Sequence, residues 1–454
     1  MEKNLTEGSV AKTLLSFSLP YLFSYLLQTL YGMADLFIIG QFDGVAVTTA
    51  VSIGSQVMHM LTVMIVGLAM GSTVMIGRAV GAGDRERVNE AVGNTVSLFL
   101  AVSAAATVLL LLGVRGIVQL ILTPAEAAEG TVQYLTICFL GIPFITAYNI
   151  LSAVFRGMGD SKSPMYFIAA ACIANILLDY LFIGGLGMGA AGAALGTTLS
   201  QTISVAAALW VMRRRGTRIR FTVSSLRPRW EVMKGLLGIG VPVALQDGFI
   251  QMAFIVITVI ANRRGLNDAA AVGVVEKIIG ILFLVPSTML STVSALAAQN
   301  IGAGKYDRAR RVLGYAVAAS VSFGLISSVW MMFAAEPAVG LFTSDERVTV
   351  LGGQYMRGYV WDCIFAGIHF CFSGYFCACG LSGVSFLHNF ISVVFVRVPL
   401  AYLASVCFAE TLLPMGLASP AGSAASVAVC AGVYIWMRKR ESGAGCAAER
   451  EAGA

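Results

Sequence analysis

Charged side chains are scarce in this sequence. Asp, Glu, Lys and Arg together make up 12% of the 454 residues, about half of the share of roughly 25% that is usual in soluble proteins. Hydrophobic residues make up 57%, about 259 residues, and 49 glycines come in addition. A soluble protein of this composition would lack the polar surface to cover its core. The composition therefore excludes a soluble enzyme, a nucleic-acid-binding protein and a secreted disulfide scaffold, and it predicts a polytopic membrane protein.

Several motifs that carry chemistry are also missing. His59, His369 and His388 are isolated, and none has a second ligand at metal spacing. Cys377 and Cys379 have no second pair at the spacing of a zinc site. No Gly-x-x-x-x-Gly-Lys-Ser/Thr phosphate-binding loop occurs. The sequence therefore predicts no metal site, no cofactor, no catalytic residues and no enzyme activity.

Twelve apolar runs are long enough to cross a bilayer, which takes about 20 residues of helix. None of them shows the alternation of apolar and polar residues that a β-barrel requires, so they are expected to be helices. The expected fold class is an all-α membrane protein with twelve transmembrane helices. The approximate limits of the runs are 14–39, 50–77, 91–113, 132–154, 165–186, 190–212, 236–261, 271–298, 311–333, 353–378, 386–408 and 412–437.

Basic residues are distributed unevenly among the segments between these runs. Alternate segments, beginning with the N-terminus, hold 23 of the 30 Lys and Arg residues, and the segments on the opposite side hold five. Because basic residues accumulate on the cytoplasmic side, both termini are predicted to be cytoplasmic in a multi-pass protein of the inner (plasma) membrane. The basic cluster at 213–234 serves either as a topological anchor or as a contact for anionic lipid.

An internal repeat divides the chain into two halves. The sequence Arg78-Ala-Val-Gly-Ala-Gly-Asp-Arg85 recurs in the second half as Gln299-Asn-Ile-Gly-Ala-Gly-Lys-Tyr306. Each half holds six runs, an even number, so both halves enter the membrane from the same side and form a parallel repeat. Two such lobes around a central cavity are the architecture of alternating access. The predicted division is an N-lobe at 1–212, a basic cytoplasmic linker at 213–234, a C-lobe at 235–440 and a cytoplasmic tail at 441–454.

The first run carries a polar stripe that ends in an acidic residue. Asp35 closes the run, and helical steps of three and four residues lead back from it through Tyr31, Gln28 and Ser24 to Tyr21. An ionisable group inside a membrane span is costly unless it is paired or hydrated. The stripe therefore predicts a water-lined cavity; alternatively, Asp35 lies at the membrane interface as a helix cap.

The fifth run supplies a second acidic residue to the same half. Asn175 and Asp179 are one helical turn apart and share a face, so the amide could help the carboxylate to hold one proton or sodium ion. If Asp35 converges with Asp179 in an apolar surround, the two carboxylates repel each other, which is the physical requirement for a proton or sodium switch. We predict a cation-coupling site at Asp35, Asn175 and Asp179; a purely structural role is the alternative.

The second half holds further polar candidates. Asp247 and Gln251 lie on one face of the seventh run, and Glu276 lies in the eighth. Asp362 and Arg397, in the tenth and eleventh runs, form either a structural ion pair or a contact to substrate. We assign to the substrate cavity Tyr21, Gln28, Tyr31, Gln246, Asp247, Gln251 and Glu276.

Two prolines occupy equivalent early positions in the two halves. Pro20 lies in the first run and Pro242 in the seventh. A proline removes a backbone donor and kinks a helix. Pro20 and Pro242 are therefore predicted hinges that couple protonation of Asp35 to the shape of the cavity, or else static bends that aid packing.

Taken in order on this doubled frame, five motifs resemble the multidrug and toxic compound extrusion (MATE) family over essentially the full chain. They are Met33-Ala-Asp35-Leu-Phe-Ile-Ile-Gly40, the Gly-Ala-Gly loops at 81–83 and 302–304, Phe155-Arg-Gly-Met-Gly-Asp160-Ser-Lys-Ser-Pro164, Asn175-Ile-Leu-Leu-Asp179, and Gln299-Asn300.

The resemblance implies two six-helix lobes and antiport of protons or sodium against organic, often cationic, compounds. It also implies that the family's acidic residue of the first helix falls on Asp35, and its fifth-helix Asn and Asp on Asn175 and Asp179. One branch of the family uses acidic residues in the seventh and tenth helices, and Asp247 and Asp362 do not match that spacing. We therefore expect the coupling site in the N-lobe.

The predicted function is a secondary active antiporter that exports amphipathic organic cations in exchange for protons or sodium. The expected partners are small organic cations and membrane lipids, with no nucleic acid, and the expected state is a monomer. The alternative is a flippase or exporter of a lipid-linked or polar metabolite on the same frame. A large anionic substrate would call for several basic residues in the cavity, and only Lys277 and Arg397 lie within the runs.

Overall fold

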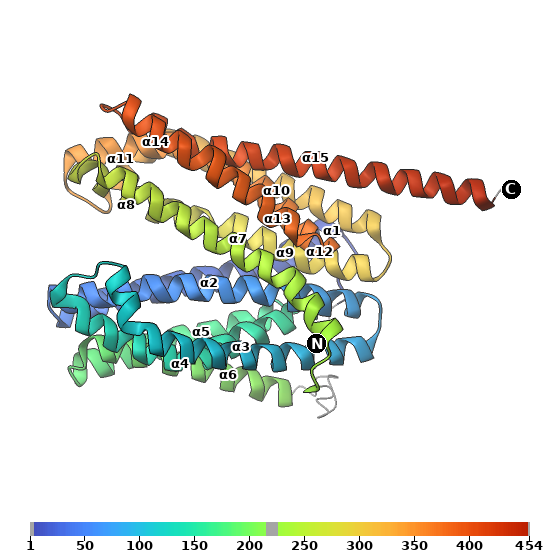
Figure 1. Cartoon of the computed structure of the whole chain (residues 1–454), viewed down its shortest axis with the longest axis horizontal. Helices are drawn as coiled ribbons and strands as arrows, with labels where there is room; N and C mark the ends of the chain where they lie inside the picture. The colour runs from blue at the N-terminus through green and yellow to red at the C-terminus, as the bar shows by residue number, and fades with distance from the viewer. Residues whose placement is uncertain (1–3, 215–225, 453–454) are drawn as a thin grey trace. The chain divides into compact units, whose positions relative to one another are not determined.

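The computed structural model describes residues 4–214 and 226–452, with side chains described up to residue 440. The chain is helical nearly throughout, and no strand occurs in these residues (Figure 1). Most of the predicted basic linker, at 215–225, and the side chains of the predicted tail from 441 onward lie outside this description. The elements are α1 (Val10–Phe42), α2 (Val45–Gly81), α3 (Arg85–Leu120), α4 (Ala125–Gly157), α5 (Lys162–Asp179), η1 (Tyr180–Gly185), α6 (Gly189–Arg214), α7 (Trp230–Asn262), α8 (Leu266–Leu282), α9 (Leu284–Gly302), α10 (Tyr306–Gly340), α11 (Glu346–Tyr359), α12 (Asp362–Cys379), α13 (Ser382–Ile391), η3 (Ser392–Arg397), α14 (Val398–Cys407) and α15 (Leu413–Ala452).

Twelve helical segments in the described residues are long and apolar enough to cross a membrane. Each falls on one of the twelve predicted runs, so the predicted number and order of the spans are confirmed. The fifth span combines α5 with η1, the eighth combines α8 with α9, and the eleventh runs from α13 through η3 to α14.

Three of these spans are irregular inside the membrane. The eighth is interrupted at Phe283, three residues before Pro286. Because Pro286 has no N–H group, it cannot donate to the carbonyl four residues earlier, at Leu282, where α8 ends. The fifth and eleventh spans contain the π-helical turns η1 and η3. Such turns are frequent at functional sites, and here Asp179 directly precedes η1 while Arg397 ends η3.

The chain divides into two compact units, each described here by itself. Unit 1 comprises Met1–Gly248, Ser291–Tyr315 and Cys377–Ser382, and unit 2 comprises Phe249–Leu290, Ala316–Phe376 and Gly383–Ala454. Unit 1 thus holds the whole first half of the sequence together with three segments of the second half. The boundaries of the predicted lobes remain a prediction.

In unit 1, α4 is the central helix, packed against α2, α3 and α6, while α1 packs against α5. One apolar cluster includes Phe99, Phe155 and Phe167, with the last two rings edge to face at a centroid distance of 5.5 Å. A second cluster includes Tyr134 and Phe139. These clusters fix the helices that carry the polar residues described below.

Glycines permit a close approach between the repeated loops within unit 1. A Cβ atom on Gly81 would lie 1.9 Å from the carbonyl oxygen of Gln299, and a Cβ on Gly302 would lie 2.0 Å from that of Arg78. Because both distances are far below van der Waals contact, only glycine fits at either position. Gly81 and Gly302, the first glycines of the two Gly-Ala-Gly motifs, are therefore packing residues that bring the two copies of the motif together. The second glycines, Gly83 and Gly304, instead have positive φ values of 71° and 72°, which favour glycine.

Candidate functional site

Three buried polar residues meet in the first half of the chain. Asp35, on α1, is 4% exposed, and Asn175 and Asp179, one turn apart on α5, are fully buried. They come together because α1 packs along α5 and α6 covers both. Gly196 of α6 makes room for them, since a Cβ atom there would lie 2.1 Å from Oδ1 of Asp179.

Hydrogen bonding within this group is incomplete. The Thr197 hydroxyl donates to Oδ2 of Asp35 at 3.2 Å, and the side chains of Asp35, Asn175 and Asp179 lie within interaction distance of one another. In the described residues, Oδ1 of Asp35, both carboxylate oxygens of Asp179 and both polar atoms of the Asn175 amide have no well-aligned partner. A buried polar group without a partner is costly. The cluster is therefore chemically suited to take up a proton or a small cation.

Two residues of α6 belong to this region and were not predicted from the sequence. Thr197 contacts Asp35, and the Gln201 amide donates to the Tyr31 hydroxyl at 3.5 Å. The spacing of Thr197 and Gln201, one helical turn, would have placed both on the same face of the sixth run. Uncharged polar residues are common in membrane helices, so the pattern alone did not single them out.

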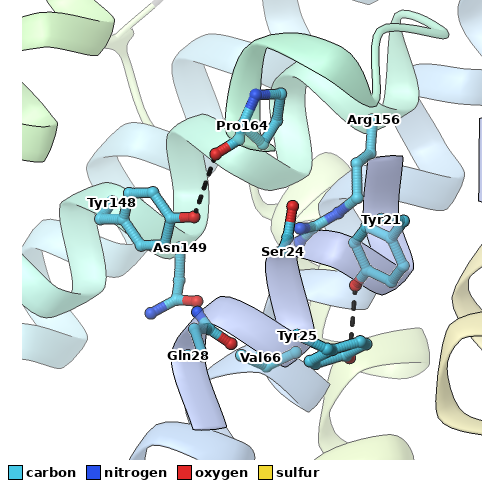
Figure 2. A pocket seen from close by; sticks show the side chains of 9 residues that line it. All are labelled: Tyr21, Ser24, Tyr25, Gln28, Val66, Tyr148, Asn149, Arg156 and Pro164. Atoms are coloured by element: carbon cyan, nitrogen blue, oxygen red, sulfur yellow. Dashed lines mark hydrogen bonds between the residues drawn. The ribbon is translucent and has the colours of Figure 1, made fainter. Parts of the chain in front are cut away.

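A pocket lies beside the polar stripe of α1 (Figure 2). The Tyr21 hydroxyl donates to that of Tyr25 at 3.3 Å, and the Tyr148 hydroxyl donates to the Pro164 carbonyl at 3.5 Å. The stripe residues Tyr21, Ser24 and Gln28 thus share one pocket, although Tyr25, which the helical steps left out, lines it too. The full lining is Tyr21, Ser24, Tyr25 and Gln28 of α1, Val66 of α2, Tyr148, Asn149 and Arg156 of α4, and Pro164 of α5.

The other predicted cavity residues are divided between the two units. Gln246 and Asp247 lie on α7 within unit 1. Gln246 is buried, and Asp247 packs against α2, where a Cβ on Gly67 would lie 3.0 Å from its Oδ2 atom. Gln251 and Glu276 lie in unit 2, where Oε2 of Glu276 accepts a hydrogen bond from the Thr258 hydroxyl at 3.2 Å. The seven predicted residues therefore do not form one cluster within a single unit.

Asp362 and Arg397 both lie buried in unit 2, but they are not directly hydrogen-bonded. Neither oxygen of Asp362 has a well-aligned partner in the described part of the chain. Arg397 instead donates to the Tyr359 hydroxyl and lies over the Phe254 ring, 5.1 Å from its centroid. Of the two alternatives left open by the sequence, a direct ion pair is not formed here.

Both predicted hinge prolines lie inside long helices, Pro20 in α1 and Pro242 in α7. Because Pro242 has no N–H group, the Gly238 carbonyl loses its helical donor. The Ser382 hydroxyl replaces that donor at 2.8 Å, as hydroxyl side chains often do in membrane proteins. This contact stabilises the proline site, and the hinge role itself stays a prediction.

No group of three or more His, Cys, Asp or Glu residues is placed to hold a metal ion among the residues that the structure describes. His388 is held by hydroxyls, with Nε2 2.9 Å from Oγ of Ser373 and Nδ1 3.2 Å from Oγ of Ser426. The His369 ring lies 5.5 Å from the His388 ring, between centroids. The two histidines are neighbours in the core of unit 2, whereas the sequence alone predicts them to be isolated.

Comparison with known proteins identifies the family. Residues 20–181 and 242–403 each match the MatE family model. The chain belongs to the MatE family. The two matches begin at Pro20 and Pro242, in agreement with the predicted repeat, so the twelve helices form two six-helix lobes. The family resemblance and the predicted fold class are thereby confirmed, and the chain is a multi-pass membrane protein of a transporter family rather than an enzyme.

Curated relatives match along most of this MatE chain. The probable multidrug resistance protein YoeA of Bacillus subtilis is 26% identical over 444 residues, which cover 96% of each chain. A FAD transporter of Shewanella oneidensis is 24% identical over 410 residues, 88% of this chain and 89% of the relative. Among solved structures, an outward-facing multidrug resistance MATE family transporter has a TM-score of 0.89 at 22% identity, over 97% of this chain and 98% of that one. This last similarity shows the shared fold.

Proposed function

We propose that this MatE protein is a secondary active antiporter that exports amphipathic organic cations in exchange for protons or sodium. The observation that carries the proposal is the pair of buried carboxylates, Asp35 and Asp179, with Asn175 beside them. The name of the relative YoeA, a probable multidrug resistance protein, supports drugs as the substrate class.

The buried carboxylates provide a physical basis for coupling. Two ionised carboxylates in an apolar surround repel each other and lack hydration, so this state is unfavourable without a cation. A proton or sodium ion relieves the repulsion, and an organic cation does the same by Coulomb attraction. The coupling ion and the organic cation therefore compete for the same two carboxylates, and binding of the coupling ion favours release of the substrate. Exchange follows if the cavity switches from one side of the membrane to the other only when either the coupling ion or the substrate is bound.

The orientation in the membrane belongs to the same proposal. The 23 basic residues on one side of the spans, against five on the other, support cytoplasmic termini for a protein of the inner (plasma) membrane. In that orientation the coupling ion enters down its gradient while the substrate leaves. We further propose that the protein works as a monomer surrounded by lipid.

The test is efflux of ethidium from proteoliposomes under an imposed pH or sodium gradient. The variants Asp35→Asn and Asp179→Asn, and the two combined, are expected to lose at least 10-fold of the gradient-driven rate. Glu126→Gln, at an exposed position in the first turn of α4, is the matched control and is expected to transport normally. Transport at the wild-type rate by the combined variant would contradict the proposal.

A second candidate function is export of a polar, anionic metabolite. It is supported by the relative from Shewanella oneidensis, which is named as a FAD transporter. The two functions differ in their dependence on the carboxylates: export of FAD without any ion gradient, unaffected by Asp35→Asn, would favour the metabolite exporter. Ethidium export that stops without a gradient favours the cation antiporter.

A further inference from the structure

The pocket beside α1 contains a buried cation that the coupling mechanism does not use. Arg156 lies in the last turn of α4 and is only 8% exposed. A basic residue at the end of a span usually extends its charged group to the membrane surface. From the sequence, Arg156 lies between the fourth and fifth runs, in one of the segments whose basic residues indicate the orientation. Instead its side chain points toward Ser24 and Tyr21 of α1 (Figure 2).

The guanidinium group of Arg156 has an aromatic contact but no acidic partner. It lies over the Tyr21 ring, 4.9 Å from the centroid. The nearest acidic residue along the chain, Asp160, is occupied at the start of α5, where it accepts hydrogen bonds from the backbone N–H groups of Lys162 and Ser163 and from the Ser163 hydroxyl. Within the described residues, no ion pair or hydrogen bond to a carboxylate involves Arg156. A buried charge without a counter-ion is unfavourable, so the pocket favours an anion.

The rest of the pocket is consistent with a single small anionic group. Arg156 is the only charged residue among the nine that line it, and the others include the neutral donors Tyr25 and Gln28. The cavity volume is only about 20 Å³, so the pocket has room for a small end group of a ligand, such as a carboxylate, and not for a whole drug molecule.

We propose that Arg156 forms a subsite for an anionic group of the transported compound, so that the protein exports zwitterionic as well as cationic amphiphiles. The proposal rests on the exporter function proposed above and adds a determinant of specificity to it. A guanidinium group is well suited to this task because it can bind both oxygens of a carboxylate with two parallel hydrogen bonds.

The subsite is separate from the coupling carboxylates. Tyr21, beneath the guanidinium, and Asp35 are both on α1 and fourteen residues apart, which corresponds to about 21 Å along a helix that rises 1.5 Å per residue. A substitution at Arg156 should therefore leave the coupling site intact. This separation makes the proposal distinguishable from a general loss of function.

The experiment compares two fluorescent substrates that differ only in one anionic group. Rhodamine 110 has a free carboxylate, and rhodamine 123 is its methyl ester, a simple cation. Initial rates of gradient-driven efflux from proteoliposomes are measured for the wild type, Arg156→Gln, Arg156→Lys and Arg115→Gln. Arg115 is the matched control, because its side chain is 74% exposed at the far end of α3.

The readout is the ratio of the rate with the acid to the rate with the ester, which does not depend on the amount of active protein. Arg156→Gln is expected to lower this ratio at least 10-fold while the ester rate changes less than twofold. Arg156→Lys, which keeps the charge but loses the paired donors, is expected to give an intermediate ratio. Arg115→Gln is expected to match the wild type.

Two results would overturn the subsite. One is export of the ester but not of the acid by the wild type. The other is an unchanged ratio in Arg156→Gln, including an equal loss of both rates, which would make Arg156 a structural residue. If Arg156→Gln does not accumulate in the membrane, the ratio in Arg156→Lys decides, and an unchanged ratio there overturns the proposal. Ester export that is independent of any gradient would instead contradict the antiport proposal, while the acid-to-ester ratio still tests Arg156.

Discussion

Arg78 and Gln299 are equivalent residues of the internal repeat, and each donates a hydrogen bond to the other half of the chain. Nε of Arg78 lies 2.9 Å from the Ala378 carbonyl oxygen, and Nε2 of Gln299 lies 2.9 Å from that of Gly157. Gly157 and Ala378 are separated by the same offset as Arg78 and Gln299, and they lie near the ends of α4 and α12. All four residues belong to unit 1. The contact is therefore reciprocal and repeats the internal symmetry of the sequence.

This reciprocal contact depends on the close approach at Gly81 and Gly302. We predict that Gly81→Ala or Gly302→Ala separates the two loops and destabilises the protein by about 1–3 kcal/mol, the usual cost of overpacking. The measurement is the thermal unfolding midpoint of the purified protein in detergent. Gly113→Ala, inside α3 with no neighbouring atom within 4 Å of the added methyl, should leave the midpoint unchanged or raise it slightly. A midpoint equal to that of Gly113→Ala would show that the loops can separate without cost.

Gly196 has a different role, because it borders the coupling carboxylates. A methyl group at this position would overlap Oδ1 of Asp179, which would lie 2.1 Å from it. We predict that Gly196→Ala displaces the Asp179 side chain and lowers gradient-driven ethidium efflux at least 10-fold, with Gly113→Ala as the control. Normal transport by Gly196→Ala would mean that the position of Asp179 is not critical.

The Thr197 hydroxyl makes the only well-aligned hydrogen bond to Asp35 in the described residues. Thr197→Val keeps the shape of the side chain and removes this donor. The loss of the hydrogen bond to the Asp35 carboxylate costs about 1 kcal/mol. We predict that the concentration of coupling ion needed for half-maximal transport changes about fivefold. Thr202→Val is the control on the same helix, because the Thr202 hydroxyl donates to a backbone carbonyl of that helix, at Thr198. Equal behaviour of the two variants would exclude a role for Thr197 in ion binding.

Ser382 and Pro242 can be tested as a pair. Ser382→Ala removes the donor to the Gly238 carbonyl, which Pro242 deprives of its helical partner, and should destabilise the protein by about 1–3 kcal/mol. Pro242→Ala restores the helical N–H group, so Ser382→Ala should be almost without effect in that background. Thermal unfolding of the four proteins of this cycle gives the coupling energy. Additive effects would show that Ser382 does not compensate for the proline.

The sequence predicted the spans and the repeat well because both depend on simple quantities. Hydrophobic length alone locates twelve helices, and the offset of 221 residues between Gly81 and Gly302 pairs the two glycine loops. The interruption at Phe283 was not foreseen, although Pro286 was visible in the run. An apolar run shows where the chain crosses the membrane. Where the helix breaks within that run depends on whether neighbouring helices supply hydrogen bonds to the backbone groups that lose their helical partners.

The contacts of individual polar residues were harder to predict. Asp35 and Asp179 were recognised because a carboxylate in a membrane span is costly, whereas the uncharged Thr197 gave no such signal. Arg156 was interpreted as a topological charge, since the sequence gives its depth in the membrane but not the direction in which its side chain points. That direction is set by the packing of α4 against its neighbours, and it changes the charge of the pocket beside α1.

The central claim is that Asp35 and Asp179 exchange an inorganic cation for the organic one. The most direct measurement is proton release when rhodamine 123 binds to the purified protein in weakly buffered detergent solution, at several pH values, with and without sodium. We predict that binding of the dye releases protons, or bound sodium at high sodium concentration, and that the dye binds more tightly as the pH rises. Asp35→Asn combined with Asp179→Asn should release neither ion. Tight binding of the dye by the wild type without release of protons or sodium, at any pH, would contradict the account.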